Sequence, residues 1–124
     1  MQHSIGSFLN HLEFQKNYSS HTIKSYRRDL LEFDNYLTQN GKGSSVDPAK
    51  IDHISIRDFL SHLHQRSNAK SSIARKLATI RSFYRFLHAQ GKVSYNPARL
   101  VRNPRLPDRK PRFLSLSEIE TILR

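Results

Sequence analysis

The sequence SSIARKLATIRSFYRFLHAQG, residues 71–91, decides the fold class of this chain. Its apolar side chains recur at spacings of three and four, the period of an α-helix, and form one stripe: Ile73, Leu77, Ile80, Phe83, Tyr84 and Leu87. Gly91 follows directly and is typical of a helix end. Opposite the stripe fall Ser71, Arg75, Ser82 and Arg85, and its flanks carry Ser72, Lys76, Thr79 and Arg81. The pattern predicts an amphipathic helix with one buried face and one polar face.

Three earlier segments have the same helical period, and none has the alternation of a strand. A helix from about Ser4 to Lys16 would bury Ile5, Phe8, Leu9 and Leu12. A second, with Ser19 or Ser20 as its N-cap and an end at the glycines of 40–43, would bury Ile23, Tyr26, Leu30, Phe33 and Leu37. A third, beginning near Ser55, would bury Ile56, Phe59, Leu60 and Leu63. We therefore expect an all-α fold, a compact bundle of four or five helices followed by an extended linker.

The composition of the chain changes after this bundle, which we place at residues 1–102. Residues 103–114 are basic and hold Pro104, Pro107 and Pro111, which disfavour helix and predict an extended interdomain linker. Ser115 and Glu118 then form a capping box before a new apolar run. We expect residues 115–124 to be the first turns of a further domain, and the chain to be the N-terminal part of a longer protein.

The net charge is concentrated in residues 70–112. This stretch carries twelve Lys or Arg residues and a single acid, Asp108, so its net charge equals the +11 of the whole chain. A positive charge of this size, concentrated in one stretch, indicates a polyanionic partner, with nucleic acid as the first candidate.

The composition argues against several classes of function. The chain has no Cys, hence no disulfide, thiolate nucleophile or Cys-type zinc site. His62 and His64 stand two apart and would diverge on a helix, so we predict no metal site. There is no glycine-rich phosphate loop, no signal peptide and no long apolar run, and we expect no cofactor and a cytoplasmic location.

The second helix also has a basic polar side. Lys24 and Arg28 fall opposite its stripe together with His21 and Ser25, and Arg27 lies on the flank. Such groups bond phosphate oxygens, and Arg also reads guanine in the major groove. Outward cations are equally the ordinary composition of a solvated helix face, and the neighbouring acids of the second helix keep that alternative open there. No acid lies between residues 70 and 91, which favours phosphate binding by the fourth helix.

These segments together resemble the core-binding, SAM-like domain at the N-terminus of tyrosine site-specific recombinases, closest to the Xer-type recombinases and related integrases. The resemblance rests on SHTIKSYRRDL at 20–30, on the helix at 72–87, on Asn96-Pro97-Ala98, and on FLSLSEI at 113–119 after the linker. It implies a helical domain and a catalytic domain that close around duplex DNA, with two helices laid against the major groove. By matching position the DNA-binding residues would be Lys24, Arg27, Arg28, Ser71, Ser72, Arg75, Lys76, Thr79 and Arg81, with linker contacts from Arg105, Arg109, Lys110 and Arg112.

The resemblance places the chemistry outside these residues. Members of the family cut and rejoin DNA through a 3′-phosphotyrosyl link, without ATP or metal, using a catalytic domain that follows the linker. The His-x-x-Arg pattern of that domain occurs nowhere in this chain, so we assign no catalytic residue and expect no catalysis by these residues alone. The resemblance also implies other recombinase protomers as partners, met in part through the first helix.

Three alternatives remain open at this point. The chain could be a stand-alone helical DNA-binding accessory or regulatory protein, a protein–protein module whose basic stretch serves solubility, or an RNA-binding domain, although exposed stacking aromatics are not evident. The DNA hypothesis predicts that Arg75→Ala weakens DNA binding and leaves the fold intact, because Arg75 lies opposite the buried stripe.

Overall fold

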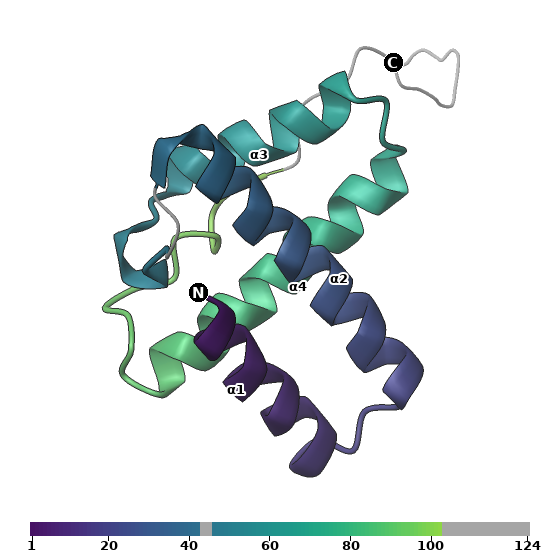
Figure 1. The fold of residues 1–124 in the computed structure, drawn as a ribbon, viewed down its shortest axis with the longest axis vertical. Coiled ribbons are helices and arrows are strands. Elements are labelled where there is room, and N and C mark those ends of the chain that lie inside the picture. The colour runs from purple at the N-terminus through teal and green to yellow at the C-terminus, as the bar shows by residue number, and fades with distance from the viewer. Residues whose placement is uncertain (43–45, 103–124) are drawn as a thin grey trace, which may run out of the picture.

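A computed structural model describes residues 1–42 and 46–102 of the chain (Figure 1). Its helices are α1 (Gln2–Phe14), α2 (Ser20–Leu37), α3 (His53–Gln65) and α4 (Lys70–Ala89). A π-helical turn, Thr38–Lys42, follows α2, and a 3-10 turn, Pro48–Lys50, precedes α3. These ranges contain no strand, and the all-α prediction is confirmed. The predicted linker at 103–114 and the restart at Ser115 lie outside the described residues.

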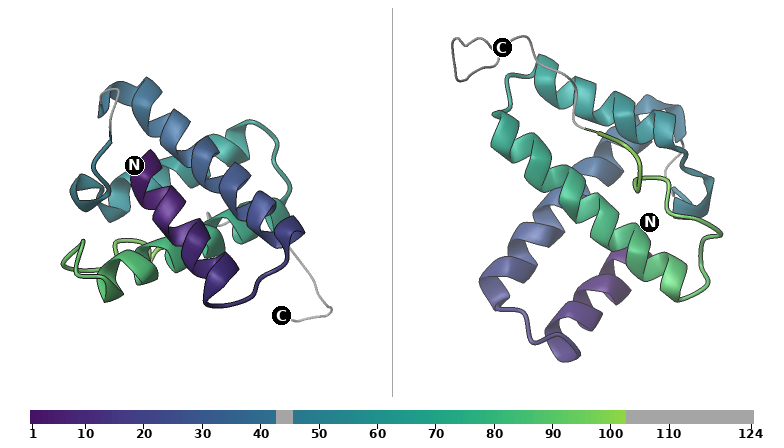
Figure 2. Two further views of the ribbon diagram at one scale, coloured as in Figure 1. Left: turned by 60° about the horizontal axis from the view of Figure 1, so that its bottom comes forward. Right: turned by 180° about the vertical axis from the view of Figure 1, so that it is seen from behind.

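The longest helix, α4, organises the bundle. It contacts α1, α2 and α3, and α2 crosses it near the middle (Figure 1). Seen from behind, no other helix lies in front of α4, so one side of it faces outward over its length (Figure 2, right). The bundle therefore presents α4 as an exposed ridge, with α2 crossing beneath it.

Side-chain caps set where two of the helices begin. The Ser19 hydroxyl accepts a hydrogen bond from the Thr22 amide at 3.2 Å, as the sequence predicts. The Asp52 carboxylate accepts one from the Ser55 amide at 3.0 Å, and this bond holds the pKa of Asp52 below its usual range. Because Asp52 is the cap, α3 starts at His53, slightly before the predicted position.

The helix ends differ from each other. Gly91 has a φ of +73°, the left-handed conformation that a glycine after a helix supplies at little cost, and α4 ends there as predicted. The sequence predicts that the second helix ends at residues 40–43; the α-helix ends at Leu37, a π-helical turn continues to Lys42, and Gly43 lies outside the described residues.

The predicted apolar stripes form the core. Every stripe residue is buried except Tyr26, which is half-buried and packs against the core. Phe8 of α1 meets Phe83 of α4 edge-on, with their ring centroids 5.6 Å apart. The Tyr84 hydroxyl donates to the Pro48 carbonyl at 2.9 Å, and burial raises the pKa of this phenol. The core thus ties the first helix, the 3-10 turn and α4 together.

The segment after α4 folds back onto the bundle. Val93, Ala98 and Val101 are buried in the same core. The Arg81 side chain holds the segment by donating hydrogen bonds to the carbonyl oxygens of Ala98 and Val101. Residues 92–101 therefore pack against the helices as part of the same bundle. No helix in the described part of the chain combines the length and apolar character that a membrane span requires.

Candidate nucleic-acid interface

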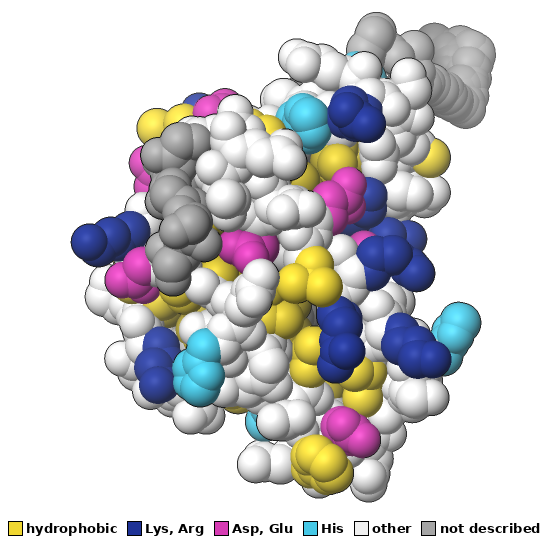
Figure 3. Space-filling view, in the orientation of Figure 1, with side chains coloured by type: hydrophobic (Ala, Val, Ile, Leu, Met, Phe, Trp, Pro, Cys, Tyr) yellow, Lys and Arg dark blue, Asp and Glu magenta, His cyan; other side chains and the backbone are white. Residues whose placement is uncertain are grey.

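The outward side of α2 carries three cations that are free of ion pairs with other described residues. Lys24, Arg27 and Arg28 are all exposed, and none takes part in a salt bridge or side-chain hydrogen bond within residues 1–42 and 46–102. Dark blue Lys and Arg side chains gather on the right of Figure 3, over α2 and the adjoining end of α4. An unneutralised set of this kind is available to bind an anion.

A buried carboxylate joins α2 to α4 next to these cations. The Arg75 Nη2 and Nε groups of α4 donate to Asp29 Oδ1 at 2.8 Å and Oδ2 at 3.2 Å, and Thr79 Oγ1 donates to Oδ2 at 3.1 Å. The Asp29 side chain is 1% exposed, whereas that of Arg75 is 46% exposed. The hydrogen bonds that Arg75 donates to the Asp29 carboxylate raise the pKa of Arg75. Arg75 is thus half-anchored, with part of its guanidinium turned to solvent.

Three more residues of the predicted DNA-binding set have side chains that bind other parts of the protein. Lys76 is paired with Glu32 of α2 at 2.8 Å, donates to Asn68 at 3.0 Å, and has a side chain only 12% exposed. Thr79 is buried beneath Arg75, and Arg81 holds the segment after α4. These three side chains bind protein in this structure, and each would have to leave its partner to reach a phosphate.

The sequence-predicted set therefore divides in two. Lys24, Arg27, Arg28 and Ser71 are exposed, Arg75 is half-exposed and Ser72 is half-buried, so these side chains can meet a ligand. Lys76, Thr79 and Arg81 instead join α4 to α2 or to the following segment. The predicted contacts at Arg105, Arg109, Lys110 and Arg112 lie outside the described residues.

Small side chains make up much of the outward face of α4. Ala74 and Ala78 are exposed between Ser71 and Arg85, and Ser82 is half-buried on the same side. Small residues let a helix backbone approach a groove closely, and an Ala methyl can contact the methyl group of thymine. The two alanines were not among the predicted site residues, although their helical positions, opposite the apolar stripe, are a signal that could have found them.

We expect Arg75→Ala to lower the free energy of unfolding by roughly 1–3 kcal/mol, measured by urea denaturation followed by circular dichroism. The substitution leaves the buried Asp29 carboxylate with the Thr79 hydroxyl in place of its cation, and an uncompensated buried charge is costly. The partial exposure of Arg75 keeps the effect below that of a fully buried pair. The sequence-based expectation that Arg75→Ala leaves the fold intact did not include this ion pair.

A second variant separates charge from packing. In Asp29→Asn/Arg75→Ala the neutral amide needs no counter-charge, so this double variant is expected to be more stable than Arg75→Ala. Equal urea midpoints for Arg75→Ala and the unsubstituted chain would mean that the ion pair contributes nothing to the fold.

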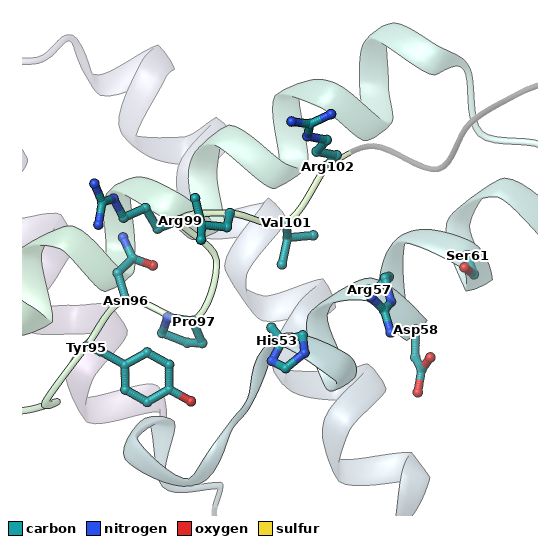
Figure 4. A pocket seen from close by; sticks show the side chains of 11 residues that line it. His53, Arg57, Asp58, Ser61, Tyr95, Asn96, Pro97, Arg99, Val101 and Arg102 are labelled. Atoms are coloured by element: carbon teal, nitrogen blue, oxygen red, sulfur yellow. The ribbon is translucent and has the colours of Figure 1, made fainter.

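The described residues offer no candidate metal-binding cluster. No group of three or more His, Asp or Glu side chains that could hold a metal ion occurs among them. A hollow of about 830 Å³ lies between the start of α3 and residues 95–102, lined by side chains that include His53, Arg57 and Asp58 (Figure 4).

Comparison with known proteins adds to this geometry. Residues 5–91 match the family model described as phage integrase, N-terminal SAM-like domain. No solved structure matches the chain.

Curated relatives match over nearly the whole chain. A tyrosine recombinase XerC of Thermodesulfovibrio yellowstonii is 38% identical over 117 residues, which cover 94% of this chain and 36% of the relative. One from Chlorobaculum tepidum is 41% identical over 117 residues, covering 92% of this chain and 35% of the relative. One from Myxococcus xanthus is 39% identical over 119 residues, covering 96% and 38%. The chain thus spans little more than a third of the length of these relatives.

Proposed function

The chain belongs to the phage integrase N-terminal SAM-like domain family, and from this membership we propose that it binds duplex DNA at a recombination site, as the N-terminal domain of a tyrosine site-specific recombinase. One observation carries the proposal. Lys24, Arg27 and Arg28 on α2 lie free of ion pairs among the described residues, beside a half-exposed Arg75 that the same helix holds in place. Fixed and free cations on two adjoining helices suit the regular spacing of backbone phosphates.

In this proposal α4 enters the major groove. The groove is about 12 Å wide and admits one α-helix. The outward Ala74 and Ala78 allow the α4 backbone to come close to the base edges, while Ser71 and Arg75 supply hydrogen-bond donors. The cations of α2 then bind phosphates beside the groove. The Asp29 carboxylate acts on DNA only through Arg75, as a positioning residue that fixes the direction of the guanidinium.

The proposal also covers the linker residues, the partner protomers and the DNA cleavage chemistry, which lie outside the described residues. Arg105, Arg109, Lys110 and Arg112 would bind phosphates as the chain passes from one domain to the next, and other recombinase protomers would assemble on the same DNA. Strand cleavage and rejoining through a 3′-phosphotyrosine would belong to the rest of the recombinase, because this chain lacks the His-x-x-Arg pattern. The proposed place of action is the cytoplasm.

The test is fluorescence anisotropy of this chain with a labelled 30-base-pair duplex over a series of salt concentrations. If Lys24, Arg27, Arg28 and Arg75 each neutralise a phosphate, these four contribute about −3 to −4 to the slope of log affinity against log salt, and contacts from the linker make the slope steeper. Single-stranded DNA and duplex RNA of the same length are the comparisons, and both should bind more weakly. Absence of duplex binding at low salt, or a preference for RNA, would contradict the proposal.

A further inference from the structure

We propose that the C-terminal end of α4 carries a binding site for one backbone phosphate of the DNA. The site is a hollow of about 730 Å³, which we call the Arg85 pocket, lined by Arg81, Arg85, His88, Ser94, Tyr95, Asn96 and Arg99. The inference rests on the proposed function, and it names a contact point beyond the residues predicted from sequence. Only Arg81 in this lining belongs to the predicted set, and its side chain is already bound to protein.

The wall of the Arg85 pocket is fixed by hydrogen bonds within the described residues. Asn96 Nδ2 donates to the Arg81 carbonyl at 3.3 Å, and Asn96 Oδ1 accepts from the Ala98 amide at 2.9 Å. Arg81 Nε donates to the Ala98 carbonyl at 3.0 Å. These bonds hold residues 94–99 against α4 before any ligand arrives. A preformed site of this kind loses little conformational freedom on binding.

The chemistry of the lining suits an oxyanion. It contains three Arg side chains, one imidazole, two hydroxyl groups and an amide, and no carboxylate. Arg85, His88 and Arg99 are exposed, and none makes a salt bridge within residues 1–42 and 46–102. In Figure 4 the Arg99 guanidinium extends away from His53 and Arg57 of α3. It can therefore take part in the Arg85 pocket, whose lining includes Arg99. Forked guanidinium groups match the oxygens of a phosphate.

The position of the Arg85 pocket favours a DNA phosphate over other anions. Arg85 lies on the polar side of α4 that also carries Arg75, ten residues earlier, and ten residues of α-helix extend about 15 Å. The major groove is about 12 Å wide between its two backbones. With Arg75 near one wall of the groove, the Arg85 pocket reaches the other wall. With α4 crossing the groove in this way, Arg75 and the Arg85 pocket would lie near the backbones on its two sides.

The test compares Arg85→Gln/Arg99→Gln with a matched variant, Lys50→Gln/Arg57→Gln, which removes the same charge from exposed positions on the 3-10 turn and α3. Each is titrated by anisotropy with the 30-base-pair duplex over the salt series. We expect the pocket variant to bind roughly tenfold more weakly at low salt and its slope to shrink by about one, as loss of one phosphate contact requires. The matched variant should stay within about threefold of the unsubstituted chain, because these two positions lie outside the proposed interface. Circular dichroism should show equal thermal stability.

The outcomes separate this inference from the proposed function. If the unsubstituted chain fails to bind duplex, the proposed function is lost and the inference with it. If it binds with a steep slope and the pocket variant matches it, the inference alone is overturned. It is likewise overturned if the pocket variant and the matched variant lose affinity equally, since that result reflects net charge.

Nuclear magnetic resonance distinguishes a DNA phosphate from free phosphate. The two Arg Nε–Hε signals that disappear in the pocket variant belong to Arg85 and Arg99, and they should shift when the duplex is added. The same signals should stay in place in millimolar inorganic phosphate at equal ionic strength. Shifts with inorganic phosphate and none with the duplex would make the Arg85 pocket a free-anion site and overturn the assignment.

Discussion

Leu77→Ala is expected to lower the free energy of unfolding by roughly 3 kcal/mol, within the 2–5 kcal/mol that buried leucine truncations cost. Leu77 is 1% exposed and lies on the buried stripe of α4, the helix that contacts the three others. Truncation removes apolar contacts and leaves a cavity at the point where the bundle is joined. A small domain has a total stability of only about 5–15 kcal/mol, so this is a large fraction of it.

Urea denaturation followed by circular dichroism measures the effect of Leu77→Ala. The matched control is Leu100→Ala, the same truncation at a side chain that is 83% exposed, where the change should stay within about 0.5 kcal/mol. If the two variants lose equal stability, the bundle does not depend on the stripe of α4 in the way described.

The helices and their buried faces could be predicted because they follow from local periodicity. Ile73, Leu77 and Ile80 share one side of an α-helix whatever the rest of the chain does, and the need to bury that side determines the bundle. Cap residues follow less directly from the helical period. Ser19 was among the predicted caps, while Asp52 was overlooked because the first apolar residue of α3 suggested a later start.

The roles of the polar residues could not be predicted from periodicity alone. Asp29 and Arg75 stand 46 positions apart, so their ion pair depends on how α2 crosses α4. The helical period places Thr79 on a flank of its helix, and only the packing of α2 decides that this flank is buried. The Arg85 pocket similarly requires residues 94–99 to return to α4. A sequence therefore indicates which residues are polar and outward, and tertiary contacts decide which of them remain free for a ligand.

Ala78→Glu is expected to weaken duplex binding at least about a hundredfold and to leave the fold intact. Ala78 is exposed on the outward face of α4, one residue from the buried Leu77, and Glu has a helix propensity close to that of Ala. If α4 lies in the major groove, the new carboxylate faces phosphates and base edges at close range, and like charges in such an interface cost several kcal/mol. Thermal melting should show a change within about 0.5 kcal/mol, while anisotropy with the 30-base-pair duplex shows the loss.

Two controls identify the cause of the effect at Ala78. Ala78→Gln adds the same bulk without charge, so a much smaller loss of affinity assigns the effect to electrostatics. Gln39→Glu makes the same charge change at an exposed position in the turn after α2, and it should weaken binding only slightly. Equal affinities for Ala78→Glu and Gln39→Glu would remove α4 from the DNA interface, because net charge alone would then explain both. A loss confined to Ala78→Glu, in a chain that melts normally, would instead locate the DNA on the outward face of α4. The adjacent residues Leu77 and Ala78 would then have different roles, one in folding and the other in DNA binding.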